Sequence, residues 1–166
     1  MKVGMISLGC DKNRVDAEVM LGLLKRGGYT IVNQSEEADI IIVNTCGFID
    51  PAKEESIDAI IEQAQYKKTG NCKLLVVTGC MAQRYPDQLI KEIPEIDAVV
   101  GTGKYTGILR VIDKCLKDDD SLVNVGSPEL PCLKDMPRVL TTPSHTACLK
   151  ISEGCSNCCA YCVIPQ

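Results

Sequence analysis

Five short apolar segments, separated by segments with helical periodicity, constrain the fold of this chain more than any other feature. The apolar segments are residues 2–9, 29–32, 38–45, 73–79 and 98–100. Helical periodicity is predicted for residues 14–27, 51–68, 86–92 and 104–117. Strands that alternate with helices form parallel sheets through right-handed crossovers. The sequence therefore predicts an α/β fold, a flavodoxin-like five-stranded parallel sheet in the order 2-1-3-4-5 with helices on both faces.

Two of these segments carry more specific signals. Residues 40–43 are an unbroken Ile-Ile-Ile-Val run, which indicates a strand covered on both faces. Asp50 can cap the helix that follows, and Pro51 suits its first turn. The side chains predicted to form the buried stripe of that helix are Ile57, Ile60, Ile61 and Ala64.

The pattern changes after residue 120. Residues 121–146 contain four prolines and no clear periodicity, so we expect a linker with, at most, short extended pieces. Residues 147–152 could begin a new strand. The expected organisation is an amino-terminal domain at 1–120, a linker at 121–146 and the start of a second domain at 147–166.

Composition narrows the functional classes. The 166-residue chain has 45% hydrophobic residues and a net charge of −4, which argues against disorder and against a general nucleic-acid binder. No apolar run approaches the roughly 18 residues of a membrane helix. Residues 1–9 do not resemble a signal peptide, so we expect a cytoplasmic protein with reduced thiols. Eleven cysteines in such a chain indicate metal or redox chemistry.

Three cysteines follow predicted strands directly. Cys10, Cys46 and Cys80 are separated by 36 and 34 residues, about one strand-helix unit each. The predicted strand order makes their strands neighbours, and ligands of open α/β sheets bind beyond the carboxyl ends of the strands. Three thiolates there could hold zinc or an iron–sulfur cluster with one coordination position open. The alternative is that all three are small buried residues that merely pack.

A second group of cysteines lies near the end of the chain. Cys155, Cys159 and Cys162 have the spacing C-x3-C-x2-C. Such closely spaced thiolates can bind three irons of a [4Fe–4S] cluster, and the fourth iron can then bind S-adenosylmethionine. Zinc bound by the pairs Cys155–Cys158 and Cys159–Cys162 is the alternative, although zinc pairs are usually a dozen or more residues apart.

Several other polar and cysteine residues allow two interpretations. Asn13, Asn44 and Thr45 lie beside the first cysteine group and could donate hydrogen bonds to cluster sulfurs, or could serve only turns and caps. We interpret the remaining thiols as packing or incidental, namely Cys72, Cys115, Cys132 and Cys148.

With these motifs in place, the chain resembles the radical-SAM methylthiotransferases over nearly its whole length. The matching segments are residues 7–13 with Asp16 and Glu18, then 44–49, 78–85, 149–155 and 162–165. The resemblance implies that Cys10, Cys46 and Cys80 hold an auxiliary [4Fe–4S] cluster involved in sulfur delivery. It also implies that Cys155, Cys159 and Cys162 hold the cluster that cleaves S-adenosylmethionine, with Tyr161 at the usual aromatic position.

The resemblance also implies a reaction. A 5′-deoxyadenosyl radical would abstract hydrogen from an unactivated carbon, and a methylthio group would be installed there. Residues 10–13 and 46–49 resemble the branch that modifies the β-carbon of an aspartate in small-subunit ribosomal protein twelve. The alternatives are methylthiolation of a tRNA adenosine and a non-catalytic, cysteine-rich flavodoxin-like module. The expected partners are that ribosomal protein and a reductant such as flavodoxin or ferredoxin, with no membrane; nucleic acid is not indicated.

Some positions depart from the family pattern. Cys158 occupies a position that is commonly basic or polar, and Cys148 one that is more often aromatic. The family continues into a partial β/α barrel, whereas this sequence ends four residues after Cys162. We therefore expect a truncated radical-SAM barrel and no turnover by these 166 residues alone.

Overall fold

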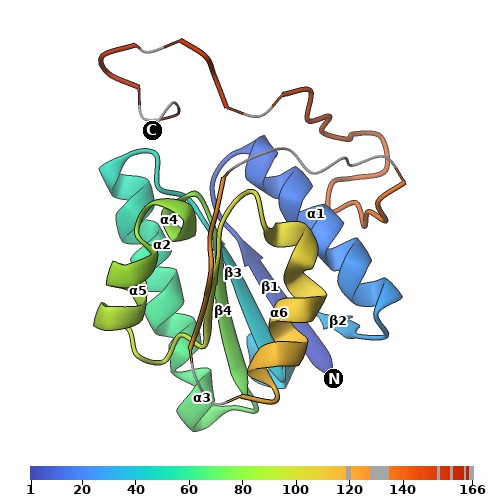
Figure 1. The fold of residues 1–166 in the computed structure, drawn as a ribbon. Coiled ribbons are helices and arrows are strands. Elements are labelled where there is room, and N and C mark those ends of the chain that lie inside the picture. Colours follow the sequence, from blue (N-terminus) through green and yellow to red (C-terminus); the bar gives the residue numbers. More distant parts are fainter. Residues whose placement is uncertain (119–120, 128–134, 153, 158, 163, 165–166) are drawn as a thin grey trace.

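The computed structural model describes residues 1–118, 121–127, 135–152, 154–157, 159–162 and 164. One six-stranded parallel sheet forms the centre, in the order β2-β1-β3-β4-β5-β6 (Figure 1). The strands are β1 (Lys2–Ser7), β2 (Thr30–Val32), β3 (Ile40–Thr45), β4 (Leu74–Gly79), β5 (Ala98–Val100) and β6 (Leu122–Asn124). The predicted α/β class and the predicted order of the first five strands are confirmed.

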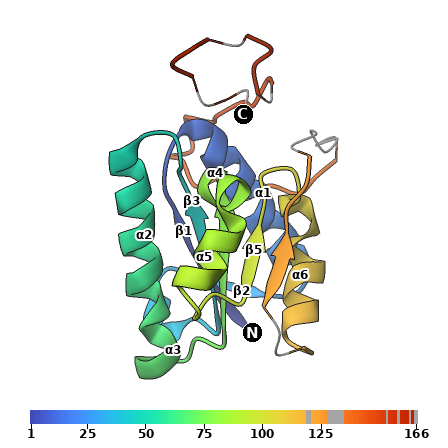
Figure 2. The same cartoon turned by 60° about the vertical axis from the view of Figure 1, so that its left-hand side comes forward.

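Helices cover both faces of the sheet (Figures 1 and 2). One face packs against α1 (Asp11–Arg26), η2 (Tyr105–Gly107) and α6 (Ile108–Cys115). The other packs against α2 (Asp50–Ala64), α4 (Cys80–Arg84) and α5 (Pro86–Glu92). Two short elements complete the fold, η1 (Ser35–Glu37) and α3 (Tyr66–Thr69). Within the described residues, no helix is long and apolar enough to cross a membrane.

The central strands are buried as the sequence predicts. Every residue of β3 and β4 is buried, and side chains alternate between the two helical layers. The buried stripe of α2 is narrower than predicted. Ile60 and Ala64 are buried and Ile57 is half-buried, but Ile61 is 48% exposed. The prediction for Ile61 is wrong because this residue lies about 100° round the helix from Ile60, beyond the contact with the sheet.

The helix boundaries differ in detail from the predictions. Asp50 begins α2 but makes no side-chain cap; its carboxylate instead pairs with Lys53 Nζ at 2.7 Å. The helix predicted over 51–68 is divided into α2 and α3, and the last helix begins with the tighter turn η2. The short helix α4 was not predicted, because its five residues span little more than one turn.

After residue 120, the structure contains one strand that was not predicted and lacks one that was. Strand β6 pairs with β5 and lies within residues 121–146, where only short extended pieces were expected. Its three residues are too few to show periodicity, and it covers the edge that β5 would otherwise expose. Residues 147–152 form no strand, so the prediction of a strand there, including Cys148, is wrong. No neighbouring strand pairs with them among the described residues.

Candidate functional site

Cys10, Cys46 and Cys80 all follow sheet strands at the same edge. Cys10 precedes α1, Cys46 follows β3, and Cys80 is the first residue of α4. The chain turns sharply before two of them, at Gly9 and Gly79, which have φ values of +95° and +97°. Those values lie in the left-handed region that glycine adopts without steric cost. Cys46 and Cys80 therefore follow the last residues of β3 and β4 directly, and Cys10 comes three residues after the end of β1.

The three loops lie against one another. A Cβ atom on Gly9 would be 3.0 Å from Cys46 Cβ and 3.3 Å from Cys46 Sγ, so the first loop touches the second. A Cβ atom on Gly47 would lie 3.1 Å from the backbone nitrogen of Met81, so the second loop touches the third. Burial, together with the neighbouring thiols of Cys46 and Cys10, raises the pKa of Cys80 to about 11. The structure thus brings the three predicted side chains to one place.

Asn13 joins all three loops through its side-chain amide. Its Nδ2 donates to Thr45 O at 2.8 Å and to Leu8 O at 3.3 Å, while its Oδ1 lies 3.6 Å from Cys80 Sγ, which donates to it. Asn44 Nδ2 donates to Asn13 O at 2.8 Å and to a hydroxyl on β1 at 3.4 Å. These amide donors therefore serve other groups of the protein rather than the sulfurs.

Two further polar contacts hold the same loops. Thr45 Oγ1 donates to Thr78 O at 2.6 Å, which links β3 to β4 beside Cys80. Ser56 Oγ, fully buried in α2, accepts from Cys46 N at 3.0 Å and lies 3.0 Å from Cys46 O and 2.8 Å from Ala52 O. Ser56 was not predicted from the sequence. The available signal was a small polar residue one position before the apolar stripe of α2.

Arg84 holds the backbone of the loop that contains Cys46. Arg84 Nη1 donates to Gly47 O at 2.9 Å, and its guanidinium carbon lies 5.0 Å from the centre of the Tyr85 ring. Phe48 and Ile49, which follow Gly47, are 52% and 53% exposed. The loop that contains Cys46 is thus held by Arg84 at Gly47, and the two residues that follow Gly47 expose apolar side chains to solvent.

The spacing of the thiols bears on which group they could hold. No set of three His, Cys, Asp or Glu side chains within the described ranges is arranged to hold a metal ion. A single zinc ion would need every sulfur within about 2.3 Å of it. An iron–sulfur cluster assigns each thiolate to a different iron, so it accepts ligands that are further apart. The two groups therefore require different arrangements of the three thiols.

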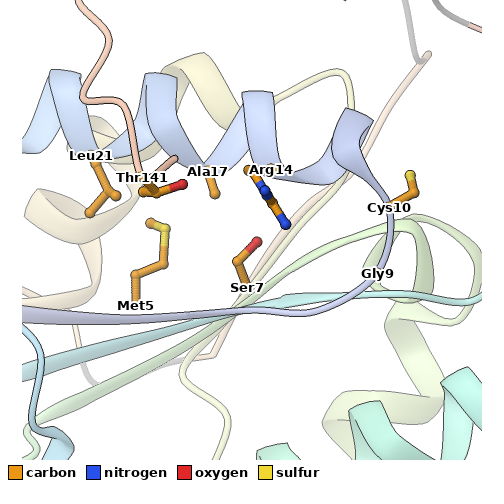
Figure 3. Close-up of a pocket in the computed structure, with 8 residues that line it drawn as sticks. All are labelled: Met5, Ser7, Gly9, Cys10, Arg14, Ala17, Leu21 and Thr141. Carbon is orange, nitrogen blue, oxygen red and sulfur yellow. The ribbon is translucent and has the colours of Figure 1, made fainter. Parts of the chain in front are cut away.

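A pocket of about 340 Å³ adjoins Cys10, between β1 and α1 (Figure 3). Arg14 and Ser7 point toward each other across its polar end, and Met5 and Leu21 line its apolar end. Thr141, from the later part of the chain, closes one side. The structure thereby brings a distant segment next to the first cysteine loop.

Cys155, Cys159 and Cys162 lie in a segment without regular structure. Cys155 and Cys159 are exposed, Cys162 is partly exposed and Tyr161 is 91% exposed. Cys162 N donates to Cys159 O at 3.0 Å, which closes one turn between these two cysteines. Figures 1 and 2 place this segment beyond the edge of the sheet where the strands end. Cys132 and Cys158, which the sequence analysis singled out, lie outside the described residues.

Comparisons with known proteins agree with the resemblance seen in the motifs. The family described as "Uncharacterized protein family UPF0004" matches residues 2–101. A protein of Clostridioides difficile (strain 630) named "Ribosomal protein uS12 methylthiotransferase RimO" is 55% identical over 166 residues, 100% of this chain and 37% of that protein. Proteins of the same name from Trichlorobacter lovleyi and Geobacter sulfurreducens are 53% and 52% identical, each over 99% of this chain and 37% of their own length. The chain thus spans little more than a third of these relatives.

Proposed function

The chain belongs to the family described as "Uncharacterized protein family UPF0004", and from this premise we propose that it forms part of a radical-SAM methylthiotransferase. The relatives that are 52–55% identical to it are all named methylthiotransferases, as the motifs led us to expect. Their names give ribosomal protein uS12, the small-subunit protein twelve, as their substrate. We propose the same substrate here, with an aspartate β-carbon as the position modified.

The first cysteine site is proposed to hold an auxiliary [4Fe–4S] cluster. Support comes from the meeting of Cys10, Cys46 and Cys80 at one edge of the sheet and from the polar framework around them. Asn13 and Ser56 fix the loop backbones, so the ligand positions are set before any metal enters. Three protein ligands leave one iron for a further ligand.

The second site is proposed to hold the [4Fe–4S] cluster that binds S-adenosylmethionine. Cys155, Cys159 and Cys162 are the proposed ligands, and Tyr161 is proposed to contact the bound nucleoside. Such a cluster supplies the electron that cleaves S-adenosylmethionine and so starts radical chemistry on the substrate. The contribution of this chain is to present three accessible thiols on a short loop near the first site.

The proposed cellular context follows from this chemistry. Iron–sulfur clusters need reduced thiols, and the nine described cysteines are all free. We propose a cytoplasmic protein that receives electrons from a small reductant such as flavodoxin or ferredoxin. Methylthiolation of a tRNA adenosine is the alternative activity, and a cysteine-rich module without catalysis is another. The printed names of the relatives favour the ribosomal protein.

Metal and sulfide analysis after anaerobic reconstitution tests both sites. We expect about eight irons and about eight sulfides per chain, as two four-iron clusters require. Cys46→Ala and Cys159→Ala should each lose about half of the iron, whereas Cys115→Ala, which alters a thiol on α6, should lose none. Stoichiometric zinc without sulfide would refute the proposal.

The substrate is tested with the complete enzyme. A peptide that contains the aspartate of ribosomal protein uS12 and an unmodified tRNA would be offered side by side, and the methylthio group would be detected by mass spectrometry. Modification of the peptide alone is the expected result. Modification of only the tRNA would refute the proposed substrate and leave the cluster assignments standing.

A further inference from the structure

Residues 136–150, here called the strap, pack against α1 (Figure 1). All residues of α1 from Val15 to Leu24 are buried, which is more than one face of a helix packed only on a sheet would bury. A Cβ atom on Gly22 would lie 2.3 Å from the carbonyl oxygen of Pro137, so the strap backbone rests directly on the helix. The strap is therefore a packed part of this domain.

A buried carboxylate of α1 holds the middle of the strap. Glu18 is fully buried; its Oε2 accepts from Arg138 Nε at 2.7 Å and forms an ion pair with Arg138 Nη2 at 2.5 Å. Its Oε1 accepts from Thr141 N at 2.7 Å and Thr141 Oγ1 at 2.9 Å. The Glu18 carbonyl accepts from Val139 N at 3.0 Å. Charge-assisted hydrogen bonds of this kind are about twice as strong as neutral ones.

A second ion pair holds the end of the strap. Lys150 Nζ donates to Asp16 Oδ1 at 2.7 Å, and the two side chains are only 2% and 7% exposed. The same ammonium lies 5.4 Å from the centre of the buried Tyr105 ring. Arg138 Nη2 also donates to Cys148 O at 2.7 Å, which joins the two fixing points.

These contacts shorten the free chain before the second cysteine site. From Lys150 to Cys155 there are 155 − 150 = 5 residues, which reach about 17 Å at full extension. Without the strap contacts, the last fixed residue would be Gly126, whose carbonyl accepts from Gln83 Nε2 at 3.0 Å. The free chain would then be 155 − 126 = 29 residues, with a reach of about 95 Å. Asp16 itself lies about 9 Å along α1 from Cys10.

We propose that Asp16, Glu18, Arg138 and Lys150 are positioning residues that hold the segment of Cys155–Cys162 over the edge of the sheet that carries Cys10, Cys46 and Cys80. Helix α1 follows Cys10 directly and also carries both carboxylates. One rigid element thus sets the position of both cysteine groups. The role of this arrangement in bringing two clusters together rests on the proposed function. The contacts that hold the strap on α1 do not depend on it.

Cross-linking of the metal-free chain tests the proposal. A short bis-maleimide would be added to the reduced 166-residue chain, and peptides that join Cys10 to Cys155, Cys159 or Cys162 would be counted by mass spectrometry. Effective concentration falls with tether length to the power of about 3/2. Lys150→Met moves the last fixed residue back to Cys148, whose carbonyl accepts from Arg138, and should reduce cross-linking about 1.7-fold. Glu18→Gln combined with Lys150→Met leaves Val139, whose N–H donates to the carbonyl of residue 18, as the last fixed residue and should reduce cross-linking about sixfold.

Lys68→Met is the matched control, since it removes an exposed lysine that pairs with Glu95 at 3.3 Å on the far end of the molecule. It should leave the cross-linking yield unchanged.

Equal cross-linking yields in wild type and in the double variant, with the circular dichroism of both intact, would overturn the proposal. Should the double variant unfold, the two single variants decide, because each keeps one ion pair. Iron analysis is a separate measurement, so loss of the cluster assignments would not change this result.

Trypsin provides a second readout. Glu18→Gln keeps Arg138 in the sequence but removes its charged partner, so cleavage after Arg138 should become at least several times faster. Thr141→Val, which removes only one hydroxyl donor to Glu18, should have a smaller effect in the same direction. Unchanged cleavage in Glu18→Gln would count against the proposal.

Discussion

Asn13 donates a side-chain hydrogen bond to the carbonyl oxygen of Thr45 across 2.8 Å, although the two residues are 32 positions apart in the sequence. Asn13 lies in the first turn of α1, three residues after Cys10, and Thr45 immediately precedes Cys46. One buried contact therefore ties the two cysteine loops together. Several consequences of this framework can be measured without any metal.

Replacing Asn13 should destabilise the metal-free chain. In Asn13→Ala the Thr45 and Leu8 carbonyls lose their side-chain donor, and an unsatisfied buried polar group costs about 1–3 kcal/mol. Urea unfolding would measure the change. The control is Asn71→Ala, which alters an exposed asparagine with a single 3.4 Å contact and should cost under about 0.5 kcal/mol. Equal effects of the two substitutions would contradict this account.

Ser56→Ala should loosen the Cys46 loop. The backbone N–H of Cys46 would lose the hydroxyl that accepts its hydrogen bond, and we expect a loss of about 1–2 kcal/mol together with faster hydrogen exchange at that amide. Exchange followed by mass spectrometry would detect it. Thr69→Ala removes a comparable hydroxyl contact on an exposed helix end and should leave the exchange of Cys46 unaltered.

Cys80 should react slowly in the folded, metal-free chain. Its pKa of about 11 lies two units above the ordinary thiol value of 9.0, so at pH 8 the reactive thiolate is roughly a hundredfold scarcer than in the unfolded chain. Iodoacetamide labelling of native and urea-unfolded protein, analysed peptide by peptide, measures the ratio. Similar rates in the two states would contradict the raised pKa of the half-buried Cys80.

Glu18 should make the free energy of unfolding depend on pH. Burial raises its pKa, but the hydrogen bonds from Thr141 and Arg138 outweigh burial and hold the pKa below the ordinary 4.5. Its stabilisation is therefore complete above about pH 4.5 and is lost as the pH falls through the lower folded-state pKa. In Glu18→Gln the free energy of unfolding should be about 2 kcal/mol lower at pH 7 and should vary less between pH 5 and 3.

Urea titrations at several pH values would measure that difference. Glu37→Gln, at an exposed pair with Lys2, is the control and should follow the wild-type curve. A Glu18→Gln protein with the same slope as wild type would show that Glu18 carries no linked proton.

Gly22→Ala should lift the strap from α1. Alanine favours helices by about 1 kcal/mol over glycine, but its Cβ would lie 2.3 Å from the Pro137 carbonyl oxygen. We expect net destabilisation and faster trypsin cleavage after Arg138. Gly107→Ala provides the comparison, because nothing lies within 4 Å of its Cβ position. A more stable Gly22→Ala protein would mean that the strap does not touch the helix there.

The sheet was predictable because its strands carry strong local signals. Residues 40–43 and 74–77 are uninterrupted apolar runs, and their placement on neighbouring strands follows from the alternation with helices. Strand β6 was not predicted as part of the sheet, since three half-exposed residues give no pattern. Ile61 shows the opposite error: it was predicted to be buried but is exposed, because an apolar residue type alone does not show how far round α2 the contact with the sheet extends.

The site was predictable only in part. The cysteine positions followed from strand ends, but their framework did not, because Asn13 and Ser56 act on backbone groups of distant loops. The strap contacts join residues 120 to 134 positions apart, for which the sequence offers no local pattern. A weak signal did exist: Asp16 and Glu18 are acidic residues among the apolar positions of α1, where a buried carboxylate requires a partner.

The strand order also has a consequence for how the protein matures. Cys10, Cys46 and Cys80 follow β1, β3 and β4, which are adjacent, so the three thiols meet only after contacts between residues some 35 positions apart have formed. A half-folded chain offers one or two of them at a time. Any ligand that needs all three is therefore accepted only by molecules whose central sheet is finished, and its uptake would serve as a readout of correct folding.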